Sequence, residues 1–312
     1  MVSRKLVFSI LIGLELVFNA AAQESAENDI VAEDGIDFVD LSTYGEALFG
    51  EPDEAITGKL VAAYNSNSTS LNPEELGSYL EGDILIPTTM RGENFGRNGI
   101  LAHGLRWSGG IVPYEIRGHF TKQDLSIIGH AFNEYHKRTC VRFRPRSNEV
   151  DFISIQSANS GCWSGIGRIG GRQIVNLQTP SCLRNYGTTM HELMHVLGFL
   201  HEQNRYERDA FVRILSHNVK PGMLINFKKS SSKETYGYGV KYDYASVMHY
   251  SLTSFSKNGN VNSHFFFTLQ LKNKDVALIG QRIGFSSGDV QKINVMYKCN
   301  VQINFLYSDM LF

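Results

Sequence analysis

The amino-acid sequence predicts an α+β fold in which strands and two helices come first and a loop-rich half follows. Four stretches have the pattern of short strands: Ile111–Ile116, Cys140–Phe143, Phe152–Gln156 and Gln173–Leu177. One helix is expected after Thr121, and a second helix carries His191 and His195. After His201 the helical signal weakens, so the chain up to Cys299 is expected to be mixed and rich in loops.

The first helix is expected to run from Thr121 to about Thr139. Thr121 is followed three residues later by Asp124, a pattern typical of a helix start. Apolar side chains then recur at helical spacing and are expected to form one stripe: Leu125, Ile128, Phe132 and Tyr135.

The second helix carries the pattern H-E-x-x-H-x-x-G-x-x-H-E, which runs from His191 to Glu202. His191 and His195 are four residues apart, so both imidazoles project from one helix face and can bind one metal ion. A catalytic zinc site needs three protein ligands and an open position for water. His201 can be the third ligand if the chain reverses at Gly198, because glycine reaches positive φ without steric cost.

Glu192 follows the first of these histidines and is expected to accept a proton from water held by the metal. The shorter pattern H-E-x-x-H occurs by chance on helices of many unrelated proteins. The added glycine and third histidine make a chance match to the pattern far rarer, since each adds a fixed position. The sequence therefore predicts a zinc site with Glu192 beside it.

Charge is distributed unevenly along the 312 residues, although the net charge is only −1. No nucleic-acid partner is expected. Residues 23–97 contain 16 Asp and Glu against 3 Lys and Arg, a net charge of 3 − 16 = −13. Residues 98–312 contain 25 Lys and Arg against 14 Asp and Glu, a net charge of 25 − 14 = +11. These two parts are expected to attract each other.

The first 22 residues have the pattern of a secretory signal peptide. Arg4 and Lys5 precede the apolar run Leu6–Phe18, and three alanines follow, so cleavage is expected between Ala22 and Gln23. The alternative is a membrane anchor, but thirteen residues are too few to span a bilayer. No later stretch is long and apolar enough either, so a secreted, extracellular protein without a membrane anchor is expected.

The chain divides into four parts. From Gln23 to about Tyr64 it is acidic, without a sustained period, and is expected to be weakly structured. Asn67 begins an Asn-Ser-Thr glycosylation sequon. Met90–Ile100 is polar and glycine-rich, as a domain boundary would be. The expected parts are a signal peptide (1–22), an N-terminal segment (23–97), one domain (98–299) and a short tail (300–312).

Four cysteines in a secreted chain indicate two disulfides, for which three pairings are possible. They are Cys140, Cys162, Cys182 and Cys299, all after the proposed boundary. None is needed as a zinc ligand, and no local feature supports a nucleophilic cysteine.

The zinc motif together with Ser246-Val-Met-His-Tyr250 resembles the astacin family of metzincin metalloendopeptidases. Gly161–Gly171 and Ile279–Cys299 are similar to two further blocks of that family, so the resemblance spans roughly Asn98–Cys299. It implies a two-lobed metzincin-type catalytic domain. A twisted mixed sheet and helices would form the N-terminal lobe, the C-terminal lobe would be loop-rich, and an extended pro-segment would cross the cleft.

The resemblance also implies roles for individual residues. Three histidines would bind one zinc ion: His191, His195 and His201. Glu192 would be general base and acid, and Met248 would lie beneath the metal in a Met-turn. Tyr250 would be an additional zinc ligand that swings away to stabilise the oxyanion of the transition state; a tyrosine hydroxyl is a suitable donor for that charge. His249 is not expected to be a ligand.

By the same resemblance Cys140 would pair with Cys299, and Cys162 with Cys182. The sequence departs from the family between Asn262 and Lys274, where Phe265–Phe267 is either a core strand or part of the substrate cleft. The tail 300–312 adds no further binding module.

Members of this family are made as zymogens, and Glu81-Gly-Asp-Ile84 is similar to the pro-segment motif F-x-G-D-I, although Leu80 replaces its phenylalanine. Asp83 would then be the latch that binds zinc in place of water. Activation would be cleavage near Arg97–Asn98, by a trypsin-like protease if Arg97 is the residue before the cleaved bond. The new N-terminus would fold inward and meet Glu202.

The function expected from these features is that of a secreted zinc endopeptidase, monomeric, which hydrolyses protein or peptide substrates. A catalytically silent zinc-bound binding protein is the alternative, but such a protein would normally have lost Glu192 or Tyr250. A structural zinc domain would close the fourth position with Cys or His, and no such ligand is evident.

Overall fold

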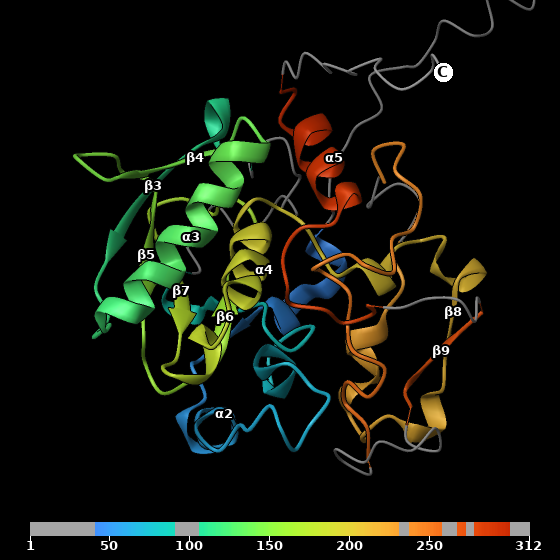
Figure 1. The fold of residues 1–312 in the computed structure, drawn as a ribbon. Helices are drawn as coiled ribbons and strands as arrows, with labels where there is room; N and C mark the ends of the chain where they lie inside the picture. Colours follow the sequence, from blue (N-terminus) through green and yellow to red (C-terminus); the bar gives the residue numbers. More distant parts are fainter. Residues whose placement is uncertain (1–40, 91–105, 231–236, 258–266, 273–277, 300–312) are drawn as a thin grey trace, which may run out of the picture. The chain divides into compact units, whose positions relative to one another are not determined.

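The computed structural model describes residues 41–90, 106–230, 237–257, 267–272 and 278–299 (Figure 1). Several predictions lie outside these residues: the signal peptide with its Ala22–Gln23 cleavage site, the activation site Arg97–Asn98, Phe265 and Phe266, and the tail 300–312. Within the described residues, no helix has the length and apolar character needed to cross a membrane.

A five-stranded sheet lies at the centre of the part that precedes His201. Its strand order is β4-β3-β5-β7-β6. The strands are β3 (Ile111–Ile116), β4 (Arg142–Pro145), β5 (Phe152–Gln156), β6 (Cys162–Ser164) and β7 (Arg172–Leu177). Neighbouring strands are parallel except for β6, which pairs antiparallel with β7. The four predicted strands are all present; β4 begins two residues later than predicted, and β6 was not predicted.

Helix α3 (Lys122–Arg138) begins where its capping pattern indicated. The Thr121 hydroxyl accepts the N–H of Asp124 at 3.2 Å, and the Asp124 carboxylate accepts the N–H of Thr121 at 2.8 Å. The prediction that Leu125 belongs to the buried stripe is wrong, because its side chain is 42% exposed. At this end of the helix the buried position, one turn before Ile128, belongs to Asp124, whose carboxylate forms the cap.

Helices α3 and α4 (Tyr186–Val196) lie side by side (Figure 1). The Tyr135 hydroxyl of α3 donates to the carbonyl of Met190 in α4 at 2.7 Å. The main apolar core includes side chains of both helices and of the sheet. Almost every residue of α4 is buried, so its polar side chains are held in an environment from which water is largely excluded.

Helix α5 (Ser287–Met296) closes the described chain. Ser286 and Asp289 form a capping box, with the Ser286 hydroxyl accepting the Asp289 N–H at 2.9 Å. This pattern was present in the sequence, but the helix was not predicted. The Cys140–Cys299 disulfide connects the chain just after α5 to the end of α3, and the second disulfide joins Cys162 and Cys182, the pairs that the resemblance implies.

The loop-rich half contains a two-stranded antiparallel sheet, β8 (Val212–Ile214) with β9 (Leu269–Leu271). A second apolar cluster lies here and includes Tyr250, Phe227 and Phe255. The other elements in the described part of the chain after residue 106 are 3₁₀ turns: Ser108–Gly110, Ser181–Leu183, Glu202–Asn204, Arg208–Ala210, Ser216–Asn218 and Met223–Phe227. Together with the central mixed sheet and its helices, this half completes the α+β fold that was predicted.

The N-terminal segment, by which we mean residues 41–90 from here on, is folded. Its elements are a 3₁₀ helix (Leu41–Leu48), β1 (Phe49–Gly50), a π-helical turn (Glu54–Gly58), α2 (Lys59–Ala62), a 3₁₀ turn (Pro73–Leu76), β2 (Ile86–Pro87) and a last 3₁₀ turn (Thr88–Met90). β1 and β2 pair in parallel. The prediction of weak structure is therefore wrong for residues 41–64.

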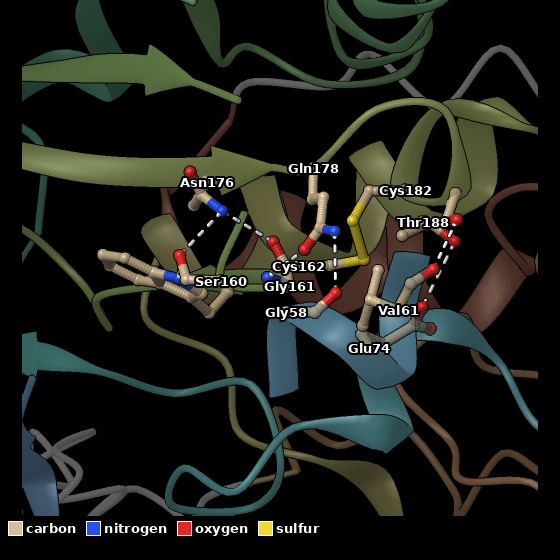
Figure 2. The surroundings of a disulfide bond; sticks show 12 residues. Gly58, Val61, Glu74, Ser160, Gly161, Cys162, Asn176, Gln178, Cys182 and Thr188 are labelled. Carbon is tan, nitrogen blue, oxygen red and sulfur yellow. Dashed lines mark hydrogen bonds between the residues drawn. A yellow bond between two sulfur atoms is a disulfide. The ribbon is translucent and has the colours of Figure 1, made fainter. Parts of the chain in front are cut away.

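Contacts with distant residues explain this structure better than local propensity does. The Gln178 side chain donates to the carbonyl of Gly58 at 2.9 Å, and the Ser181 hydroxyl donates to the carbonyl of Val61 at 2.6 Å. Figure 2 shows Gly58 and Val61 beside the Cys162–Cys182 disulfide. Short elements of this kind gain their stability from tertiary packing, which an acidic local sequence does not reveal.

Candidate metal centre

Three histidine side chains meet at the end of α4. The helix begins at Asn185, whose side chain accepts the N–H of Thr188 at 3.1 Å. Gly198 has a φ angle of 109°, so the chain reverses there as predicted and brings His201 back toward the helix. The rings of His191, His195 and His201 have centroids 4.7–5.0 Å apart in all three pairs.

Two of these histidines are oriented by backbone carbonyl groups. Nδ1 of His191 lies 2.7 Å from the carbonyl oxygen of Val247, and Nδ1 of His195 lies 2.7 Å from that of Phe199. A carbonyl oxygen only accepts hydrogen bonds, so each Nδ1 must carry the proton. In the neutral form of each ring Nε2 is then unprotonated and available as a metal ligand.

The carboxylate of Asp83 lies among the three Nε2 atoms. Its Oδ2 is 3.0 Å from His191 and 3.3 Å from His201, and its Oδ1 is 3.3 Å from His195. Oδ1 of Asp83 and Nε2 of His195 have no hydrogen-bond partner among the described residues. Burial by itself raises the pKa of Asp83, whereas positive charge on the facing rings of His201 and His195 lowers it well below its usual range.

These four side chains fit a zinc ion. One ligand atom from each lies within 4.8 Å of the others, and all four residues are buried. Imidazole nitrogens and a carboxylate oxygen are common zinc donors. Tetrahedral zinc with bonds of about 2.0–2.1 Å separates its ligand atoms by about 3.3 Å. Oδ2 of Asp83 lies 3.0 Å and 3.3 Å from Nε2 of His191 and His201, and these two nitrogens are 3.2 Å apart, which matches that separation.

Glu192 lies in helix α4 between His191 and His195. Both of its carboxyl oxygens are buried without a hydrogen-bond partner among the described residues. Its backbone carbonyl accepts the Ser164 hydroxyl at 3.0 Å, a contact that fixes this part of α4 against β6. Burial, and then the nearby carboxylates of Asp83 and Glu74, raise the pKa of Glu192 well above its ordinary value.

The Met-turn, residues 246–250, is held by one carboxylate. Asp289 at the start of α5 accepts the Ser246 hydroxyl at 2.5 Å and the Val247 N–H at 2.9 Å. Met248 is buried within the main core, and its carbonyl accepts the N–H of Glu202 at 3.0 Å. The turn is therefore tied to the chain that follows the third histidine.

Tyr250 is fully buried, and its ring centroid is 4.5 Å from that of His201. Its hydroxyl donates to the backbone carbonyl of Glu81 at 2.6 Å, so in this state it has a partner in the N-terminal segment. Both ring nitrogens of His249, beside it, have partners other than the metal centre. Its Nδ1 lies 2.9 Å from the Tyr250 carbonyl and its Nε2 lies 2.7 Å from the Tyr242 hydroxyl, contacts that position the backbone of Tyr250.

Glu202 already has two cationic partners. Lys292 Nζ lies 2.7 Å from Oε2, and Arg205 Nη1 lies 2.9 Å from Oε1, which also accepts the Asp243 N–H at 2.8 Å. Burial alone would raise the pKa of Glu202, but these cations lower it. Lys292 and Arg205 were not singled out from the sequence.

Two adjacent glutamates of the N-terminal segment reach the same region. The buried carboxylate of Glu74 pairs with Arg282 and accepts the Thr188 hydroxyl at 3.3 Å, as Figure 2 shows for Thr188. Glu75 accepts both the N–H of Ser251 at 2.6 Å and its hydroxyl at 2.7 Å. The sequence shows two acidic residues after Asn72-Pro73, a helix-start pattern, but no local pattern indicates these distant partners.

Comparison with known proteins places these features in a family context. The model of the peptidase family described as Astacin matches residues 101–298. Zinc metalloproteinase nas-8 of Steinernema carpocapsae is 42% identical over 205 residues, which are 65% of this chain and 47% of that protein. Zinc metalloproteinase nas-8 of Caenorhabditis elegans is 40% identical over 229 residues, 71% of this chain and 55% of that protein.

Among solved structures, High choriolytic enzyme 1 of Oryzias latipes, described as a hatching enzyme zinc-protease, is similar with a TM-score of 0.56 and 37% sequence identity. The match covers 62% of this chain and 93% of that one. The chain spans about half the length of the two curated relatives named above.

Proposed function

The chain belongs to the astacin family of zinc metallopeptidases, and from this membership we propose that it is the zymogen of a secreted zinc endopeptidase. The observation that supports the proposal most directly is the convergence of three Nε2 atoms and one carboxylate at a single buried point, beside the free carboxyl of Glu192. Its substrates would be proteins or peptides.

The residues of this chain divide the chemistry of peptide hydrolysis among them. Bound zinc would supply a Lewis acid that lowers the pKa of water and polarises the scissile carbonyl. Glu192, whose carboxyl oxygens have no other described partner, would take a proton at its carboxylate and return it to the leaving amine. Tyr250 would donate its hydroxyl hydrogen bond to the negative charge that develops on the carbonyl oxygen.

In the proposed zymogen these groups are blocked by the N-terminal segment. Asp83 would take the coordination position that water needs, and the Tyr250 hydroxyl is engaged by the carbonyl of Glu81. The buried contacts of Glu74 and Glu75 hold the segment nearby. The opposite net charges of residues 23–97 and 98–312 favour the same association.

Activation would follow cleavage at Arg97–Asn98 by a trypsin-like protease, and the new N-terminus would then approach Glu202. We expect Glu202→Gln to keep its zinc content while the mature N-terminus becomes more mobile, because the new ammonium group would lose a charged partner. Unchanged thermal stability and unchanged order of the N-terminus in this variant would count against the link.

The proposed secretory route can be tested separately. Asn67, the sequon residue, is exposed in the turn 65–68. Expression with its signal peptide in a eukaryotic cell should release the protein into the medium with a glycosidase-sensitive mass, and Asn67→Gln should abolish that sensitivity.

One assay tests the enzymatic proposal. The secreted chain is cleaved with trypsin, the trypsin is then inhibited, and casein digestion is compared for wild type, Glu192→Ala and a chelator-treated sample. Wild type alone should digest casein. If wild type were no faster than the Glu192 variant while both hold zinc, the chain would be a zinc-bound binding protein and the proposal would fail.

A further inference from the structure

Glu81 occupies a strained position in a turn of the N-terminal segment. Its φ angle is 51°, a left-handed conformation that residues other than glycine rarely adopt, and Gly82 follows with φ 93°. The Gly82 N–H closes the turn by donating to the carbonyl of Tyr79 at 3.0 Å. Glu81 itself has no exposed surface. A buried carboxylate in such a backbone conformation, two residues before Asp83, points to a role for the side chain.

The carboxylate of Glu81 is bonded to the chain around the third histidine. Its Oε2 accepts Nδ1–H of His201 at 2.7 Å and the backbone N–H of the same residue at 3.3 Å. Its Oε1 accepts the Asn204 side-chain amide at 2.7 Å and the Tyr44 hydroxyl at 3.3 Å. The N–H of Glu81 donates to the Asn226 side chain at 3.0 Å, which holds the turn in place.

The three histidines therefore differ in the group that accepts the hydrogen bond from Nδ1–H. For His191 and His195 the partner is a backbone carbonyl of residues 98–299, which remain after activation. For His201 the partner is the carboxylate of Glu81, which is 120 positions earlier in the sequence and leaves with the N-terminal segment. One metal ligand is thus oriented by a group that the mature enzyme does not contain.

We propose that Glu81 is a positioning residue for His201, and that through this contact the N-terminal segment makes the zymogen hold zinc more tightly. This inference rests on the proposed function, because it requires zinc at the three histidines and removal of the segment. Asp83 would add a ligand to the metal, whereas Glu81 acts on a ligand that the domain already has. Pro-segment removal would therefore withdraw two separate contributions to zinc binding.

The physical reason lies in what a carboxylate does to an imidazole. By accepting the Nδ1–H of His201, Glu81 fixes the tautomer in which Nε2 is bare, holds the ring in one orientation and makes Nε2 more basic. A carboxylate does this more strongly than a backbone carbonyl because the hydrogen bond is charge-assisted. Loss of such a partner typically lowers metal affinity about 10-fold to 100-fold.

The test measures zinc release from the uncleaved protein. Wild type, Glu81→Gln and Glu75→Gln are loaded with zinc, mixed with excess chelator, and the rate of zinc loss is followed with a colorimetric indicator. Glu75 is the matched control, since its buried carboxylate also holds the N-terminal segment through hydrogen bonds but touches no histidine of the site. We expect release from Glu81→Gln to be about 10-fold to 100-fold faster than from wild type, and clearly faster than from Glu75→Gln.

Cleavage at Arg97 provides an internal control, because wild type and Glu81→Gln then give mature chains of identical sequence. These products should release zinc at the same rate and digest casein equally. Such a result would show that the substitution acts only while residue 81 is present. Different rates for the two products would count against an effect confined to the His201 contact.

Two further results would overturn the inference. Equal release rates for uncleaved wild type and Glu81→Gln would remove the role of the carboxylate. Equal acceleration by Glu75→Gln would mean that any loosening of the segment has the same effect. A chain that holds no zinc would instead refute the proposed function, so the two failures are distinguishable.

Discussion

For the proposed zymogen, the buried pair between Glu74 and Arg282 allows a quantitative prediction about latency. The Glu74 side chain is completely buried, and that of Arg282 is 2% exposed. Glu74→Ala removes the carboxylate, and with it the acceptor for Thr188, while the guanidinium remains buried as long as the N-terminal segment stays docked. Breaking a buried ion pair by removing one partner costs about 3–5 kcal/mol.

That energy applies to the docked state, because Arg282 would be hydrated once the N-terminal segment undocks. At 1.36 kcal/mol for each factor of ten, the undocked fraction should rise about 150-fold to about 5,000-fold, up to the limit of complete undocking. The same argument predicts only about a fivefold rise for Thr188→Val, which removes one neutral hydrogen bond worth about 1 kcal/mol.

The assay is the peptidase activity of the uncleaved chain divided by the activity of the same sample after trypsin treatment, with an intact chain verified by mass. Dividing by the activated value removes any effect of the substitution on catalysis itself. Glu54→Ala is the control, because Glu54 is an exposed glutamate of the same segment. A ratio for Glu74→Ala within twofold of that control would refute the reasoning that this pair maintains latency.

Three further predictions follow from other parts of the structure. Glu192→Gln should retain zinc but lose about 10²-fold to 10⁴-fold in casein hydrolysis after activation; zinc analysis beside the assay would expose a merely metal-free variant. Burial alone would raise the pKa of Asp53, but the hydrogen bonds that its carboxylate accepts lower the pKa from 3.8 to about 2. The carboxylate therefore stabilises the fold above pH 3.8, and this contribution is lost as the pH falls through about 2, so the difference in melting temperature between wild type and Asp53→Asn should shrink over that range. Replacing Cys162 and Cys182 together by alanine, which opens a loop with a sequence separation of 20, should lower the free energy of unfolding by about 3 kcal/mol in denaturant titrations; an unchanged midpoint would contradict the chain-entropy argument.

The helix that carries the candidate metal ligands was predictable because its information is local. His191 and His195 are one helical turn apart, and Gly198 marks the reversal that returns His201, so a short stretch of sequence specifies most of the donor set. The start of α3 was predictable for the same reason, since a capping box needs only residues three positions apart. Leu125 was placed wrongly because periodicity gives the spacing of a stripe but not which neighbours will cover its end.

The electrostatic environment of the site was decided by the tertiary structure. Glu202 pairs with Lys292, which is 90 positions away, and Glu74 pairs with Arg282, which is 208 positions away. Side chains so distant in sequence meet only when separate elements pack, and no helix or strand period carries that information. The fold of residues 41–64 depends on such contacts too, which is why an acidic, aperiodic stretch looked weakly structured.

By itself the sequence indicated three candidate imidazole ligands, the carboxyl group of Glu192 beside them and, through the Leu80–Ile84 motif, the aspartate expected to face them. Only the tertiary structure decided what surrounds those atoms, including the carboxylate of Glu81 at the second nitrogen of His201. The physical reason is the separation along the sequence of the residues that interact. Ligand spacing is set by the geometry of one helix and one turn, whereas the partners that orient and charge the ligands come from wherever the folded chain brings buried polar groups together.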